Sequence, residues 1–220
     1  MGRMTLRPQQ MWRWLSIGLA LASPVANAAP EAHDGFLFRF QVGPAWARTE
    51  TVPEGDALPL AIRGQGVAVS FSLGGSLTPQ LALHGDAIVA VLNEPVAELG
   101  ELSGPLKDTS VSVGGIGIGG TWFHTSTNVY VSASLLATSL TLDSPKLKEA
   151  KLTARTGLGP GLGVTVGKEW FISDEWGLGA SLSAVGGMGL SSRDVDGEGP
   201  DFTTSTSMGF MSVQISATYH

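Results

Sequence analysis

Regular alternation of side-chain character is the feature of this 220-residue sequence that most limits its fold. In "GFLFRFQVGPAW", the even positions from Phe36 to Val42 are all bulky and apolar, while the odd positions include Arg39 and Gln41. A period of two residues is typical of a β-strand, because successive side chains of a strand point to opposite faces. After the first 28 residues no long apolar stripe with a helical period competes with it, so the sequence predicts an all-β protein.

The same alternation recurs along the chain and predicts eight strands. In the fifth, Leu135 and Leu136 change the phase of the pattern, which predicts a bulge. An even number of antiparallel strands can close into a barrel. The expected strands are residues 36–48, 62–76, 80–92, 109–123, 128–142, 152–167, 175–191 and 203–219.

One face of each expected strand is aliphatic or aromatic, and the other is mostly Gly, Ser and Thr. A lumen only eight strands wide cannot hold so many bulky side chains, so we expect the apolar face to contact lipid. The predicted fold is an eight-stranded antiparallel up-and-down transmembrane β-barrel. A soluble, lipocalin-like barrel with its apolar face turned inward is the alternative.

The N-terminus has the features of a cleaved secretory signal peptide. Three arginines precede a short apolar run that starts at Leu15, and an A-x-A cleavage pattern ends at Ala28. The run is far shorter than the ~20 residues that a membrane-spanning helix needs. We therefore expect a signal peptide over residues 1–28 and one outer-membrane β-barrel domain over residues 29–220.

The charge of the mature chain excludes several kinds of function. Removal of residues 1–28 takes away three of the 13 Lys and Arg and none of the 19 Asp and Glu, which leaves a formal net charge of −9 (10 against 19). A nucleic-acid partner is not expected, because binding phosphates needs a basic patch. The sequence contains no cysteine, so disulfides and zinc–thiolate sites are absent, and we expect no metal or cofactor.

Connections that alternate between long and short predict the orientation of the barrel. Outer-membrane barrels have short periplasmic turns and longer external loops, so both chain ends are expected on the periplasmic side. Most acidic residues then fall in or beside four external loops, and Asp86 is the one acid expected inside a strand. Aromatic residues are expected to form a girdle at the periplasmic interface, where their rings are favoured. Its predicted members are Phe36, Phe38, Trp122, Phe123, Tyr130, Trp170, Phe171, Trp176 and Tyr219.

Four ionisable residues are predicted to project into the lumen: Arg39, His84, Asp86 and Arg155. A buried charge is normally paired, so we expect an ion pair between Arg39 and Asp86 with His84 nearby. A proton or ion path through the same residues is the alternative.

The stretch "GKEW…SDEWGLGAS", around the last short turn, and the final strand Met211, Val213, Ile215, Ala217, Tyr219 carry a resemblance to a family. Together with the strand count, they make the chain similar to the small eight-stranded outer-membrane barrels of diderm bacteria, of the OmpA and OmpX type. The resemblance implies an outer-membrane location, contact with outer-membrane lipid and insertion by the barrel-assembly machinery. It also implies a last strand that ends in an aromatic residue; here Tyr219 is followed by His220.

Three motif-like stretches have simpler interpretations. "GGIGIGG" (114–120) and "GLGPGLG" (157–163) do not open a helix after a strand, so strand glycines are favoured over a dinucleotide loop. "DVDGEGPD" (194–201) resembles a calcium loop, but an EF-hand would need glutamate where Ser205 stands. A solvated loop is the better interpretation.

His124 and Ser126 are the only residues that suggest catalysis. Their H-x-S spacing is similar to the histidine and serine of outer-membrane lipid A deacylases, which are eight-stranded barrels. The topology places them in a periplasmic turn, and that turn contains no acid to orient the histidine.

Taken together, these observations predict a monomeric, non-catalytic outer-membrane barrel with acidic external loops, acting in envelope structure or surface interaction with an external partner that the sequence does not identify. A narrow, porin-like channel for small solutes and a lipid A deacylase-like enzyme are the alternatives.

Overall fold

A computed structural model describes residues 35–52, 58–145, 149, 154–192 and 205–220. The expected signal peptide (1–28) and the stretch "DVDGEGPD" (194–201) lie outside the described residues. Within the described part of the chain, no helix is long and apolar enough to cross a membrane.

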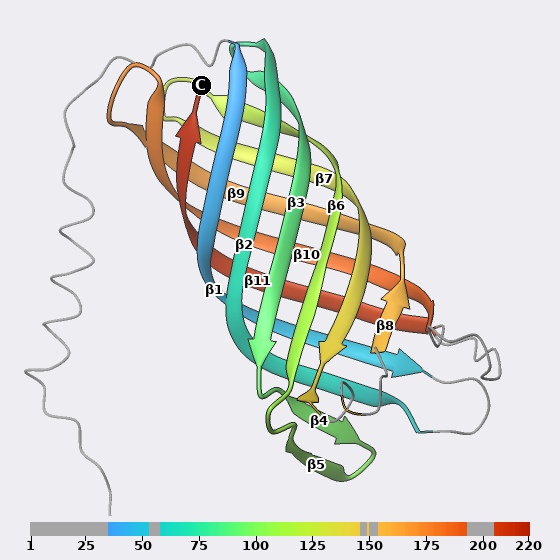
Figure 1. Cartoon of the computed structure of the whole chain (residues 1–220). Coiled ribbons are helices and arrows are strands. Elements are labelled where there is room, and N and C mark those ends of the chain that lie inside the picture. The colour runs from blue at the N-terminus through green and yellow to red at the C-terminus, as the bar shows by residue number, and fades with distance from the viewer. Residues whose placement is uncertain (1–34, 53–57, 146–148, 150–153, 193–204) are drawn as a thin grey trace, which may run out of the picture.

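The described residues form a closed antiparallel barrel (Figure 1). Its wall runs in the order β1, β2, β3, β6, β7, β9, β10 and β11, and the circle closes where β11 pairs with β1; β8 continues the line of β9 between β7 and β10. A hairpin, β4–β5, is added beside the far end of β2. The strands are β1 (Phe36–Val52), β2 (Leu60–Thr78), β3 (Leu81–Asn93), β4 (Val96–Leu99), β5 (Leu102–Pro105), β6 (Ser110–His124), β7 (Val129–Asp143), β8 (Ala154–Gly157), β9 (Gly159–Phe171), β10 (Trp176–Ser192) and β11 (Ser205–Tyr219).

The pairing register shows how the barrel closes. When directly paired residues are followed once around the wall from Arg39, the path returns to β1 at Thr49, ten residues further along the strand. Such a stagger requires the strands to tilt against the barrel axis, typically by about 35 to 45°. Residues far apart in the sequence therefore meet at one depth in the lumen.

The eight expected strands are confirmed, with two corrections to their details. The bulge expected at Leu135 and Leu136 is wrong: β6 and β7 pair without interruption, and Leu135 faces outward while Leu136 faces the lumen. The interruption lies instead at Leu158, between β8 and β9. Thr138 pairs with Gly159, but Thr141 pairs with Arg155, so one extra residue is inserted there.

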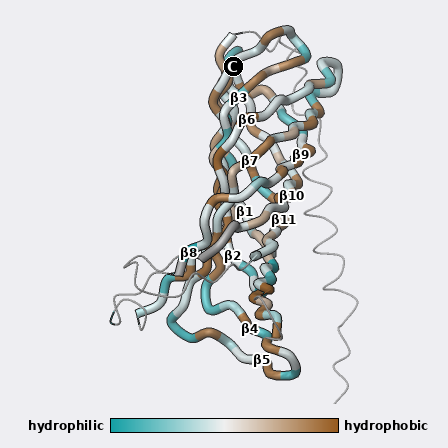
Figure 2. Tube along the Cα trace, turned by 90° about the vertical axis from the view of Figure 1, so that its right-hand side faces the viewer, coloured by the Kyte–Doolittle hydropathy of each residue, from teal (hydrophilic) through white to brown (hydrophobic). Residues whose placement is uncertain are grey.

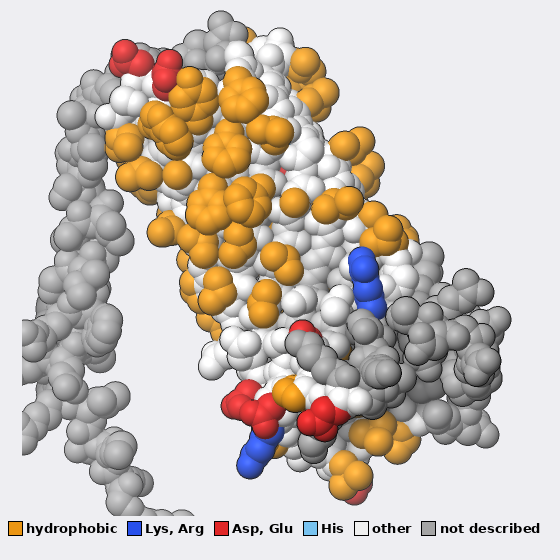
Figure 3. All heavy atoms as spheres, in the orientation of Figure 1, with side chains coloured by type: hydrophobic (Ala, Val, Ile, Leu, Met, Phe, Trp, Pro, Cys, Tyr) orange, Lys and Arg blue, Asp and Glu red, His pale blue; other side chains and the backbone are white. Residues whose placement is uncertain are grey.

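The distribution of polarity is the reverse of that in a soluble barrel. Apolar side chains cover the face of the wall that is turned to the viewer in Figure 3. Large exposed apolar side chains occur all around the wall, among them Phe71, Ile116, Leu135, Leu162, Val213 and Ile215. Buried polar side chains line much of the inside, among them Gln41, Ser72, Thr121, Ser183 and Gln214. A continuous apolar exterior of this extent is expected only where the surrounding solvent is lipid. The chain is thus a transmembrane barrel, and the soluble alternative is wrong.

The two ends of the barrel differ. Short connections at residues 79–80, 125–128 and 172–175 form one end, called here the turn end, where Asn128 takes a left-handed conformation (φ 53°). The C-terminus lies at this end, and β4 and β5 lie at the other, the loop end (Figures 1 and 2). The usual placement of short turns in outer-membrane barrels makes the turn end periplasmic and the loop end external.

The interior changes character along the axis. Near the turn end, Leu37, Ala82, Phe123 and Tyr130 form a small apolar cluster. Near the loop end, a larger apolar cluster fills the lumen, with Leu92, Val111, Val113, Leu140 and Phe210 among its members. Most of the buried polar residues lie between these two clusters.

Candidate functional site in the lumen

A buried ion pair occupies the lumen near the turn end. Nη2 of Arg39, on β1, lies 2.9 Å from Oε1 of Glu169, on β9, and Arg39 Nε donates a hydrogen bond of 3.1 Å to the same oxygen. Both residues are 1% exposed. The hydroxyl of Thr218 donates to Oε1 of Glu169 at 2.7 Å, and Nε2 of His220 lies 3.0 Å from Oε2. The carboxylate is therefore fully engaged, as a buried charge requires.

Aromatic rings surround this pair. The guanidinium carbon of Arg39 lies 4.0 Å from the ring centroid of Tyr130 and 5.5 Å from that of Phe123. The His220 ring packs against Phe171, with centroids 5.4 Å apart, and against Phe123 at 5.9 Å. Seven side chains, six from five strands and one from the C-terminal residue, thus close the turn end of the lumen. We call this group the periplasmic plug: Arg39, Phe123, Tyr130, Glu169, Phe171, Thr218 and His220.

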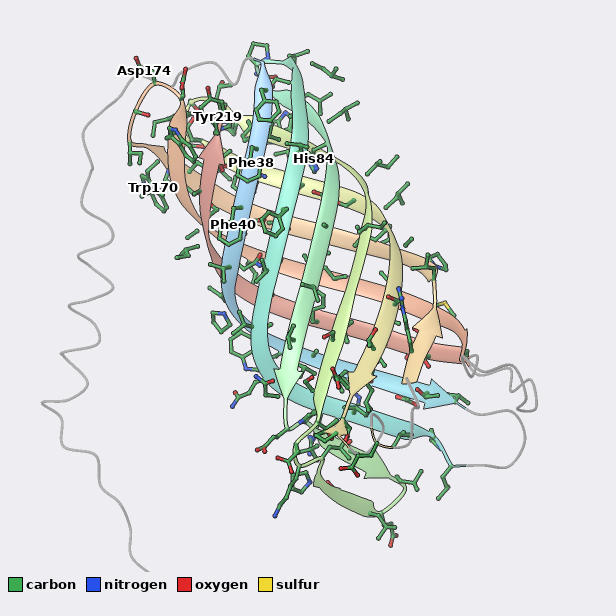
Figure 4. All side chains as sticks on the ribbon, in the orientation of Figure 1. Phe38, Phe40, His84, Trp170, Asp174 and Tyr219 are labelled. Atoms are coloured by element: carbon green, nitrogen blue, oxygen red, sulfur yellow. The ribbon has the colours of Figure 1, made fainter. Side chains whose placement is uncertain are left out.

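A second polar network lies beside the plug on β2, β3, β6 and β7. Asp86 Oδ1 accepts hydrogen bonds from Ser72 (2.6 Å) and from Nδ1 of His84 (2.9 Å), and Ser134 donates to Oδ2. A carboxylate only accepts, so the His84 proton belongs on Nδ1. Nε2 then accepts from Thr121, whose oxygen lies 2.8 Å away. His84 lies close to the turn end on β3 (Figure 4).

The order acid, imidazole, hydroxyl in Asp86, His84 and Thr121 is that of a nucleophilic triad. Its surroundings do not suit catalysis, because Thr121 is fully buried and also bonded to Ser132. The cavity beside these residues has a volume of about 30 Å³. That is space for about two water molecules. The hydrogen bonds of this network join β2, β3, β6 and β7 inside the lumen.

Further hydrogen bonds link the remaining strands across the lumen. The amide nitrogen of Gln41 donates to Ser181 (2.7 Å) and to the Tyr130 hydroxyl (3.2 Å), and Ser70 donates to the Gln41 oxygen. Ser183 donates to Gln214 at 3.1 Å. Polar side chains thus bond to one another across the lumen and fill most of its middle.

The structure places only three of the four predicted lumen residues inside. Arg39, His84 and Asp86 face the lumen, but Arg39 pairs with Glu169, so the expected ion pair between Arg39 and Asp86 is wrong. Arg155 is exposed on the outside. The extra residue at Leu158 reverses the inward and outward positions of β8 relative to β9, which the sequence pattern did not reveal.

Glu169 is the buried lumen carboxylate that the sequence pattern did not identify, because the sixth expected strand ended at residue 167. β9 continues to Phe171 and keeps its alternation, so Glu169 follows Gly163, Thr165 and Gly167 on the lumen side. Extending the alternating pattern by two residues would have placed this carboxylate inside the barrel.

Aromatic residues at the turn end divide between the two faces. Phe36, Phe38, Trp122, Trp170, Trp176 and Tyr219 lie on outward positions. The ring centroids of Trp176 and Tyr219 are 5.3 Å apart. Figure 4 shows Phe38, Trp170 and Tyr219 toward the turn end. Phe123, Tyr130 and Phe171 were assigned to the girdle, which is wrong, because they face the lumen. They alternate with outward residues on their strands and pack around Arg39 and His220 instead.

His124 and Ser126 do come together in the short turn after β6. Ser126 Oγ lies 3.0 Å from Nδ1 of His124, and Thr127 Oγ1 lies at the same distance from that nitrogen. Both residues are exposed at the turn end, and no acid among the described residues forms an ion pair with His124. The described residues also hold no cluster of three or more His, Cys, Asp or Glu side chains suited to a metal ion.

Comparison with known proteins gives similarities of fold at low identity. No protein-family model matches the chain, and no curated protein matches it. Among solved structures, the outer membrane protein OprG from Pseudomonas aeruginosa aligns with a TM-score of 0.49 and 9% identity, over 86% of this chain and 98% of OprG. Neisserial surface protein A aligns with a TM-score of 0.48 and 14% identity, over 83% of this chain and 96% of that protein. The outer membrane protease OmpT from Escherichia coli aligns with a TM-score of 0.41 and 10% identity, over 88% of this chain and 99% of OmpT.

These similarities leave the function open, and the fold assignment rests on the chain's own pairing and surface. Eight antiparallel strands close on themselves, bury polar side chains and expose apolar ones. This is the architecture of a bacterial outer-membrane β-barrel.

Proposed function

We propose that this outer-membrane barrel is a closed, non-catalytic scaffold that presents an acidic surface outside the cell, in envelope structure or surface interaction. The observation that carries the proposal is the filled lumen. The periplasmic plug, the hydrogen-bonded middle and the apolar cluster near the loop end follow one another along the axis. The cavity between Arg39, Gln41, His84 and Asp86 has a volume of about 30 Å³, which is too small for a solute path.

The surface presented by the scaffold lies beyond the loop end of the wall. β4 pairs with residues 60–63 of β2, and β5 completes a small sheet that extends the wall outward (Figure 1). Glu101 lies in the turn of this hairpin, and Leu102 beside it is 73% exposed, whereas Glu98 is paired with Arg48 and Arg63. An acidic group beside an exposed leucine suits a partner with cationic and apolar groups.

Solute flux through the purified barrel tests the proposal. We expect liposomes of phosphatidylcholine that contain the protein to swell in arabinose no faster than protein-free liposomes. A general porin in the same liposomes serves as the positive control. Rapid swelling with this protein would support the small-solute channel instead.

The contact between His124 and Ser126 supports a second candidate, an enzyme that hydrolyses acyl esters of membrane lipid. Mass spectra of lipid A from cells that express the protein, or its Ser126→Ala variant, test it. Loss of an acyl chain with the wild type, and not with Ser126→Ala, would favour the enzyme over the scaffold. Unchanged spectra with both would exclude it.

A further inference from the structure

An open groove crosses the outer wall of the barrel, on the side that faces lipid. It has a volume of about 460 Å³ and runs over β2, β3, β6, β7 and the β8–β9 line. Small residues on outward positions form its floor: Ala87, Ser112, Gly114, Ala137 and Ser139. Bulky outward side chains border it, among them Phe71, Val89, Ile116 and Leu158.

The pairing register explains the shape of the groove. Gly114, which has no side chain, pairs with Ser139, so the wall is low at this level. Two residues nearer the turn end on β7, Ala137 pairs with Ile116, whose bulky side chain borders the groove. Over most of the wall, by contrast, outward positions carry large apolar side chains. A recess in an apolar wall can hold an extended hydrocarbon chain with more van der Waals contact than a flat wall offers.

Arg155 lines the groove at its external end. Its backbone pairs with Thr141, which in turn pairs with Ser112, so a cation and two hydroxyl-bearing residues share one level. Arg155 is exposed and forms no ion pair within the described part of the chain. Arg48 and Arg63, the other outward arginines at this end, both pair with Glu98, at 3.7 and 2.8 Å. An unpaired guanidinium beside a lipid-facing recess lacks a counter-charge from the described protein.

The depth of Arg155 matches a lipid headgroup. Trp122 pairs with Val131 at the turn end, and Thr141 lies ten residues further along β7 than Val131. A tilted transmembrane strand needs about 9 to 11 residues to cross the bilayer, so Arg155 lies near the external boundary of the hydrocarbon. The groove runs from this boundary toward the middle of the membrane.

We propose that the groove binds one phosphate-bearing acyl lipid of the external leaflet, with an acyl chain over Gly114 and Ala137 and its phosphate at Arg155. A guanidinium suits this role because it forms paired, charge-assisted hydrogen bonds to phosphate oxygens. Ser112, Ser139 and Thr141 supply hydroxyl groups at the same end of the groove.

Native mass spectrometry of the detergent-purified full chain tests the proposal. The probe is palmitoyl-oleoyl phosphatidylglycerol, and palmitoyl-oleoyl glycerol, which lacks the phosphate, is the comparison ligand. We expect one phosphatidylglycerol to remain bound per barrel, and Arg155→Gln to weaken its retention about tenfold, as the loss of one charge-assisted contact predicts. Arg63→Gln, at the same end of the barrel but outside the groove, should leave retention unchanged.

A second pair of variants tests the chain-binding part of the groove. Ala137→Leu fills the floor with an apolar side chain, and we expect it to reduce retention. Ala133→Leu adds the same side chain on the same face of β7, outside the groove, and should have no effect. Heat-modifiable migration on gels shows which variants fold. If Arg155→Gln does not fold, the comparison of Ala137→Leu with Ala133→Leu still tests the proposal. Three results would overturn the proposal. Either Arg155→Gln or Ala137→Leu retains as much phosphatidylglycerol as the wild type, or the wild type retains no lipid, or it retains palmitoyl-oleoyl glycerol as well as phosphatidylglycerol.

Discussion

Arg39 and Glu169 form a buried ion pair across the lumen, although 130 residues separate them in the sequence. The pair joins β1 to β9, and Thr218 adds β11 through its hydrogen bond to the same carboxylate oxygen. Since β1 also pairs with β11 in the wall, the network connects the first and last strands of the barrel from inside as well as through the backbone.

Loss of the Glu169 carboxylate should destabilise the barrel strongly. Glu169→Ala leaves the Arg39 guanidinium buried without its counter-charge, so we expect the free energy of unfolding to fall by about 3 to 5 kcal/mol. Urea titration in lipid vesicles, followed by tryptophan fluorescence, measures it. Glu101→Ala, in the exposed hairpin turn, is the control and should change stability by less than about 0.5 kcal/mol. A similar small change for both variants would contradict the importance of the pair.

Asp86 should couple to His84 more strongly than to Arg39. Asp86 bonds directly to His84, whereas the Arg39 ion pair is with Glu169. In double-mutant cycles with Ala, residues in one network typically couple by about 0.5 to 3 kcal/mol. We expect a coupling in this range for His84 and Asp86 and a smaller one for Arg39 and Asp86. A larger coupling energy for Arg39 and Asp86 than for His84 and Asp86 would instead support the ion pair that the sequence predicted.

Gly167 should not tolerate a side chain, because Tyr130 occupies the space beside it. A Cβ atom at Gly167 would collide with the Tyr130 ring, while one at Gly163, on the same face of β9, would meet Leu136 at 3.4 Å. Overpacking of this kind costs about 1 to 3 kcal/mol, so we expect Gly167→Ala to lower unfolding stability by that amount. Gly163→Ala is the matched control. Equal stability of the two variants would mean that Tyr130 moves aside without cost.

The outward aromatic residues should lie at the headgroup level of the membrane. A variant of residues 29–220 that keeps Trp176 and replaces Trp46, Trp122 and Trp170 by Phe has a single tryptophan, because the other two of the six lie in the expected signal peptide. In vesicles, we expect lipids brominated near the headgroup to quench its fluorescence more than lipids brominated near the chain ends, because interfacial indoles prefer that depth. Stronger quenching by the deep bromines would place this part of the barrel inside the hydrocarbon and contradict the interfacial girdle.

Ion pairs at the loop end should matter little for stability. Arg48 and Arg63 are more than half exposed where they contact Glu98. Exposed pairs contribute about 0 to 1 kcal/mol, since water screens them, so Glu98→Gln should lower the free energy of unfolding by no more than that. A loss as large as that of Glu169→Ala would show that the hairpin is essential to the barrel.

The sequence predicted most of the wall because each strand carries its own evidence. Side chains alternate with period two, and lipid outside a narrow lumen decides which face is apolar. The errors arose where this local signal ended or changed. Glu169 was not identified as a lumen residue because the expected sixth strand ended four residues before β9 does. Arg155 was assigned to the wrong face because one inserted residue reverses the inward and outward positions without changing the composition of the strand.

Strand number and the direction of the apolar face were thus determined by the sequence itself, since the alternation of side chains depends on neighbours one or two residues apart. The partners of buried charges were decided only by the tertiary structure. Arg39 meets Glu169 rather than Asp86 because the stagger of the closed barrel, ten residues per circuit, sets which residues share a depth. The groove beside Arg155 has the same origin, since the register alone brings Gly114 to Ser139 and Thr141 to Arg155.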